Sequence, residues 1–152
     1  MCQAVPPFAA TLADAVGVSA RGELSELLAA FDELSRDLAH PAALLDAGLV
    51  YLALNRPYAR MVRLPASALV GKEHSRVHGD RQAALAILEA FTGGAPCEVP
   101  LPKPVQGPEG AVYRARRVTP IRDSGDRALA MVLEYCPDAA EGGAADVRRE
   151  EA

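Results

Sequence analysis

Hydrophobic positions repeat with helical spacing in the first part of the chain. Between Gly22 and Leu38 the large apolar residues follow one another at intervals of three and four, and charged residues occupy most positions between them. This spacing places the apolar residues in one narrow stripe along a helix. The stripe consists of Leu24, Leu27, Phe31, Leu34 and Leu38. It can pack against its own domain or against a second copy of the chain as a short coiled coil, and the pattern leaves both open.

A hairpin and a second group of helices are expected after the His40-Pro41 pair, which ends the first helix. The short apolar runs Ala42–Asp46 and Leu49–Leu54 predict two buried strands. A short helical piece is expected over Tyr58–Leu64. The apolar spacing of Arg81–Phe91 then predicts a longer helix, which ends before a pair of glycines.

The remaining pattern is that of a sheet. Cys97–Val105 must be extended because its alternating prolines exclude a helix, and Ala111–Ile121 is a long strand. Arg127–Tyr135 is apolar on both faces, as a central strand requires. This order of elements predicts an α+β domain with one five-stranded antiparallel sheet, flanked by short helices and preceded by an amphipathic helix. We expect the proline-rich strand at an edge, with three prolines on its unpaired side, namely Pro100, Pro102 and Pro104.

Four stretches in sequence order resemble a PAS domain over residues 42–136. The hairpin DAGLVYLALN ends in Asn55, where PAS domains usually carry an asparagine, and NRPYARMVRLPASALVGK then keeps the PAS spacing to Gly71-Lys72. EAFTGGAP is similar to the end of the long PAS helix, and VTPIRDSGDRALAMVLEY resembles the last PAS hairpin. The resemblance implies a sheet and small helices that enclose an apolar cavity.

The chain departs from the PAS pattern at two places. Many PAS domains have Gly-Tyr between the short helices, where this chain has Arg63-Leu64. The Asp-Ile-Thr motif that often couples the last strand to an output helix is replaced by Cys136-Pro137-Asp138. Proline there blocks continuation into a helix, so the first helix or a partner on the sheet is the expected output route.

The resemblance divides the chain into four parts. These are an irregular arm over 1–20, an amphipathic helix over 21–39 for capping or dimerisation, a PAS-like domain over 40–136, and a solvated tail over 137–152. It also implies a ligand pocket in which His74 and Tyr113 are polar anchors. The residues expected to line this pocket are Leu52, Tyr58, Met61, Val70, His74, Leu85, Leu88 and Tyr113.

The most metal-like group is His74, His78 and Asp80, because two histidines four apart share one helix face. Ser75 occupies the position at which the zinc motif HExxH needs its glutamate, and we therefore predict no metal site. By resemblance haem is disfavoured, since the long helix carries no histidine. A flavin adduct is disfavoured too, since Lys72–His78 contains no cysteine. The prediction that remains is a domain without a cofactor.

Four arginines form a basic stripe on the predicted fourth strand. It could pair with an anionic ligand or an acidic partner, but a solvated outer face is the favoured interpretation. The stripe consists of Arg114, Arg116, Arg117 and Arg122.

Composition narrows the functional classes. The formal net charge of −4 argues against nucleic acid as a partner, and no apolar run has the length of a membrane span. Three cysteines without metal-like or disulfide-like spacing predict a cytoplasmic protein. The sequence thus predicts a sensory or signal-transduction domain, homodimeric, that binds a small ligand or a signalling protein. The alternatives are a ligand-free interaction scaffold and, less favoured, a small α+β enzyme of the isomerase type.

Overall fold

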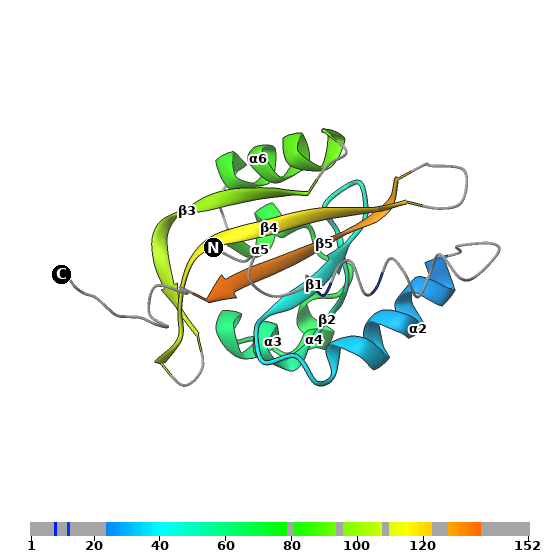
Figure 1. Cartoon of the computed structure of the whole chain (residues 1–152), viewed down its shortest axis with the longest axis horizontal. Helices are drawn as coiled ribbons and strands as arrows, with labels where there is room; N and C mark the ends of the chain where they lie inside the picture. Colours follow the sequence, from blue (N-terminus) through cyan, green and yellow to red (C-terminus); the bar gives the residue numbers. More distant parts are fainter. Residues whose placement is uncertain are drawn as a thin grey trace.

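The computed structural model of the chain describes Phe8, Leu12 and residues 24–78, 81–93, 96–107, 110–122 and 128–137. Its centre is one five-stranded antiparallel sheet with the strand order β2-β1-β5-β4-β3, which confirms the predicted sheet (Figure 1). The strands are β1 (Ala42–Leu45), β2 (Tyr51–Leu54), β3 (Cys97–Gln106), β4 (Val112–Arg122) and β5 (Ala128–Pro137). The helices are α2 (Leu24–Ser35), α3 (Arg56–Val62), α4 (Ala66–Leu69), α5 (His74–His78) and α6 (Arg81–Thr92).

The sheet separates two apolar cores. Along the central strand β5, Met131, Leu133 and Tyr135 point to one core, while Ala130 and Val132 point to the other. This alternation follows from the two-residue period of a strand, and it explains why β5 is apolar on both faces. We call the face covered by α3, α4 and α6 the inner face, and the face covered by α2 the outer face.

The apolar stripe of α2 packs against the outer face of its own sheet. Leu27 and Phe31 are fully buried there, Leu34 and Leu38 are partly buried, and Leu24 stays exposed. The structure thus realises one of the two alternatives that the pattern left open. In this packing Leu27 and Phe31 are not available to a second copy, and the homodimer itself stays a prediction.

Phe8 and Leu12 also belong to the outer core, although the sequence suggested only an irregular arm in this region. The Phe8 ring lies edge-on to Phe31, with ring centroids 5.5 Å apart. The tail predicted for 137–152 lies outside the described residues apart from Pro137, which ends β5.

β3 forms an edge of the sheet, as predicted from its prolines. The pairing with β4 passes from Pro100 opposite Ala115 to Val105 opposite Tyr113, so β3 advances five residues while β4 advances two. A bulge of this kind bends a strand and interrupts its ladder. The proline segment therefore breaks the pairing with β4, rather than only lining the free side of a regular strand. No helix in the described ranges is long and apolar enough to cross a membrane.

Candidate functional site

All four tyrosines of the chain meet in the inner core. Tyr51 on β2, Tyr58 on α3, Tyr135 on β5 and Tyr113 on β4 follow one another as edge-on neighbours. The ring centroids are 5.6 Å apart from Tyr51 to Tyr58, 5.6 Å from Tyr58 to Tyr135 and 6.1 Å from Tyr135 to Tyr113. Edge-on contacts of this kind stabilise aromatic pairs beyond the area they bury. We call these four residues the tyrosine cluster.

One hydrogen bond and a buried arginine give the tyrosine cluster its polar character. The hydroxyl oxygens of Tyr51 and Tyr58 are 2.5 Å apart and share a hydrogen bond. The guanidinium of Arg116 lies 5.9 Å from the centroid of the Tyr135 ring. Arg116 is only 3% exposed, so the predicted solvated stripe is wrong at this position. A row of aromatic and polar side chains thus crosses the inner core from β2 to β4.

Burial raises the pKa of every tyrosine in the cluster above its usual value. At Tyr58, the nearby Tyr135 and Tyr51 raise the pKa further, because a second negative charge beside either one is unfavourable. Arg116 opposes the rise in the pKa of Tyr135. The hydroxyls therefore stay protonated at neutral pH, where they donate and accept hydrogen bonds.

His74 borders the tyrosine cluster. Its backbone N–H donates to the carbonyl oxygen of Leu49 at 2.9 Å, and its fully buried ring lies 5.9 Å from the ring of Tyr51. The other two members of the metal-like group, the side chain of His78 and the whole of Asp80, lie outside the described residues. In the described part of the chain no three His, Cys, Asp or Glu side chains are grouped so as to hold a metal ion.

Five of the eight predicted pocket residues belong to this side of the sheet. Tyr58 and Tyr113 are members of the cluster, His74 borders it, and Met61 and Leu88 are partly buried against the inner core. Whether they contact a ligand stays a prediction.

The other three predicted pocket residues are placed elsewhere. Leu52 packs on the outer core because it follows the inward-facing Tyr51, and adjacent residues of a strand point to opposite faces. Leu85 is 63% exposed, since Ile87 and Phe91 occupy the buried face of α6. Val70 is 46% exposed at the end of α4. These three lie apart from the tyrosine cluster, and whether they contact a ligand stays a prediction.

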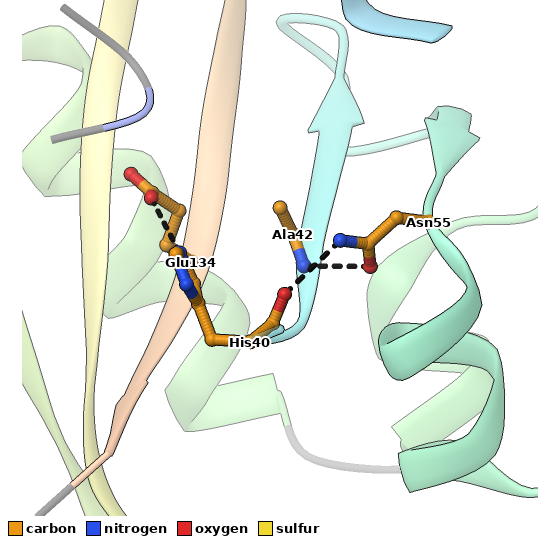
Figure 2. Close-up of polar contacts among 4 residues, drawn as sticks. All are labelled: His40, Ala42, Asn55 and Glu134. Carbon is orange, nitrogen blue, oxygen red and sulfur yellow. Dashed lines mark hydrogen bonds and ion pairs between the residues drawn. The ribbon is translucent and has the colours of Figure 1, made fainter. Parts of the chain in front are cut away.

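Asn55 ties three segments together at the start of α3 (Figure 2). Its side-chain oxygen accepts from the backbone N–H of Ala42 at 3.0 Å and from that of Tyr58 at 3.1 Å. Its side-chain amide donates to the carbonyl oxygen of His40 at 3.0 Å. This cap explains why α3 begins at Arg56, two residues before the predicted start. It also positions Tyr58 in the cluster.

The segment after α2 is held a second time, by an acidic residue of β5. Oε2 of Glu134 lies 2.9 Å from Nε2 of His40, and the side chain of Glu134 is 4% exposed (Figure 2). His40, Glu134, Tyr51 and Tyr135 are not among the site residues expected from the sequence. The only sequence pattern that could have indicated them is the alternation of β5. It places Glu134 on the outer face, directly beside the inward-facing Tyr135.

The comparisons with known proteins concern the fold. No family model and no curated protein matches this sequence. Among solved structures, the PAS domain of BvgS from Bordetella pertussis is similar, with a TM-score of 0.57 and 19% identity over 75% of this chain and 89% of that chain. A sensory box sensor histidine kinase from Vibrio cholerae has a TM-score of 0.56 and 17% identity, covering 75% of this chain and 92% of that chain.

A third similar structure is VqmA of Vibrio cholerae bound to DPO, with a TM-score of 0.57 and 16% identity over 70% of this chain. The match covers 56% of the VqmA chain, so this chain spans little more than half of that protein.

Proposed function

Because this chain has the PAS fold, we propose that it is a sensory domain that acts by binding a small molecule or a protein partner, not by catalysis. The observation that carries the proposal is the tyrosine cluster. Buried polar groups are costly when unpaired, and Nε of the buried Arg116 beside the cluster has no hydrogen-bond partner among the described residues. A ligand or partner that bonded to these hydroxyls would favour a different packing of the inner core. Protonated phenols also suit recognition better than general-base catalysis.

We propose that β5 transmits a change in the packing of the inner core to the outer face of the sheet. Tyr135 belongs to the inner cluster, and the preceding Glu134 holds His40, which follows α2. A shift of β5 at Tyr135 would therefore move the partner of His40 and alter how α2 packs. This route agrees with Pro137, the last residue of β5, which disfavours continuation into a C-terminal output helix.

The structural neighbours support a sensory role in general terms. VqmA is a dimer that binds DPO and target DNA, and another neighbour is a sensor histidine kinase. For this chain the ligand, the partner, the homodimer and the cytoplasmic location are proposals. A homodimer would need a surface other than Leu27 and Phe31. Haem and flavin stay disfavoured by the sequence, and a visible absorption band of the purified chain would contradict that prediction.

Hydrogen exchange on the full chain tests the relay. Tyr58→Phe removes the hydroxyl that bonds with Tyr51 and keeps the ring that packs against Tyr135. The matched control is Tyr113→Phe, which removes a hydroxyl that makes no hydrogen bond to the described residues. We expect Tyr58→Phe to speed the exchange of α2 amides more than that of α6 amides, and Tyr113→Phe to change neither. An equal increase in the exchange rates of α2 and α6 amides would mean general destabilisation and would overturn the proposed relay.

A further inference from the structure

An open cleft of about 540 Å³ lies outside the inner core, where the end of α2, the start of α3 and the start of β4 meet. Three arginines line it, Arg36, Arg56 and Arg60, together with His40. No aspartate or glutamate is among its lining residues in the described part of the chain. The cleft is therefore strongly basic on a chain whose formal net charge is −4.

The positive charge of the cleft is only partly neutralised from within the described residues. Arg56 and Arg60 are one helical turn apart on α3, and like charges at this spacing destabilise a helix. Neither forms an ion pair within 4.0 Å in the described ranges, whereas Arg36 is paired at 2.9 Å with the exposed Asp32. An arrangement that costs stability in the free chain would be relieved by a bound anion.

The rest of the lining is suited to an organic molecule rather than to a bare ion. Leu38, Pro57 and Ala111 contribute apolar surface, and the volume falls in the range of small-molecule sites. Guanidinium groups bind carboxylates and phosphates through paired hydrogen bonds. We propose that the cleft binds a small organic acid. Its carboxylate or phosphate would contact Arg56 and Arg60, and its apolar part would lie against Pro57 and Ala111.

Tyr113, at the floor of the cleft, is held in place by its neighbours on the inner face of the sheet. Tyr113 packs edge-on against Tyr135, and a side chain at Gly107 would overlap the Tyr113 ring, so the chain approaches this ring as closely as glycine permits. His40 lines the same cleft while it pairs with Glu134. A bound acid would thus contact the segment after α2 and lie above the buried Tyr113. Binding in the cleft does not itself depend on the proposed sensory function.

Titration of the full chain with three aromatic probes tests the site. Benzoate and phenyl phosphate carry the two anionic groups, and benzyl alcohol is the neutral control of similar size. We expect both anions to shift the amide resonances of Arg56, Arg60 and Ala111. We expect benzyl alcohol to bind at least about tenfold more weakly, as the loss of one charged hydrogen bond implies. The anion that binds more tightly shows whether the cleft prefers a carboxylate or a phosphate. Equal binding of benzyl alcohol, or shifts confined to other surfaces, would overturn the proposal.

Variants then assign the binding to the two arginines. Arg56→Gln and Arg60→Gln should each weaken anion binding about tenfold or more. Both side chains are exposed, so the variants should fold, which circular dichroism verifies. The matched control is Arg76→Gln on α5, an exposed arginine 3.5 Å from Glu73 that does not line the cleft. Retained affinity in both test variants, or an equal loss in Arg76→Gln, would contradict the site.

Discussion

Glu134 and His40 form a partly buried pair between two segments that are far apart in the sequence. Oε2 of Glu134 lies 2.9 Å from Nε2 of His40, and the two side chains are 4% and 24% exposed. A second pair, Arg36 with Asp32, has the same 2.9 Å separation but side chains that are 68% and 77% exposed. The two pairs thus differ in burial at equal distance, which makes them a matched set.

His40→Ala should destabilise the fold by about 1–3 kcal/mol, because the buried carboxylate of Glu134 loses its hydrogen-bond partner. Arg36→Ala should cost less than about 1 kcal/mol, since exposed ion pairs contribute little. Urea unfolding measures both. In the His40→Ala background, Glu134→Gln should recover part of the loss, because a neutral amide is less costly to bury than a carboxylate. Equal effects of the two alanine variants would contradict the role given to burial.

Asn55→Ala should destabilise the fold by about 2–4 kcal/mol, because it removes a helix cap and leaves the buried N–H of Ala42 without its acceptor. Asn55→Asp keeps the acceptor oxygen but loses the donor to His40, so we expect an intermediate loss. Thr92→Val is the control, since it removes one exposed side-chain bond to the carbonyl oxygen of Glu89. Urea unfolding measures all three variants. An equal loss of unfolding free energy in Thr92→Val and Asn55→Ala would contradict the role given to the hydrogen bonds of Asn55.

Much of the fold was predictable because the spacing of apolar residues and the presence of proline determine secondary structure locally. The five strands, their antiparallel order and the edge position of β3 follow from apolar alternation and from missing N–H donors. The packing partner of α2 was not predictable, since a narrow apolar stripe fits its own sheet as well as a second helix. The bulge of β3 was not predictable either, because register depends on both strands.

The candidate site was predictable only where one residue carried the signal. Asn55 was found because its position after the second strand resembles the PAS pattern. The tyrosine cluster was missed as a unit, since Tyr51, Tyr58, Tyr113 and Tyr135 come from four elements that only the tertiary fold brings together. Arg116 was assigned to a solvated stripe because charge usually marks a surface, and nothing in the local pattern reveals an aromatic partner.

Arg63→Gly should stabilise the fold by roughly 0.5–1 kcal/mol. Arg63 ends α3 with φ 63° and ψ 35°, a left-handed conformation that costs a residue with a Cβ about 1–2 kcal/mol and glycine almost nothing. The greater freedom of glycine in the unfolded chain offsets part of that gain.

Arg60→Gly is the matched control for this change. It lies inside the same helix, where glycine should destabilise by about 0.5–1 kcal/mol. Thermal or urea unfolding should therefore give opposite signs for the two substitutions. A loss of stability at both positions would show that the left-handed conformation of Arg63 does not destabilise the folded chain.

The tyrosine cluster predicts that the fold weakens at alkaline pH. Tyrosine in an unfolded chain ionises near pH ~10, whereas burial raises the pKa of all four tyrosines in the folded chain. Above pH ~10 the unfolded chain therefore holds fewer protons than the folded chain, and the free energy of unfolding falls as pH rises. Each buried tyrosine contributes up to about 1.4 kcal/mol per pH unit in that window. Below pH ~9 the tyrosines contribute no slope.

Urea unfolding at pH ~9 and pH ~11 measures this slope, and tyrosinate absorbance should rise together with the loss of circular dichroism. Tyr58→Phe should make the decline shallower, because it removes the tyrosine in contact with both Tyr51 and Tyr135. Exposed lysines also titrate at these pH values, so the difference between the two proteins, rather than either slope alone, isolates the cluster. Ionisation of all four tyrosines near pH ~10 with the fold intact would contradict the buried, hydrogen-bonded arrangement.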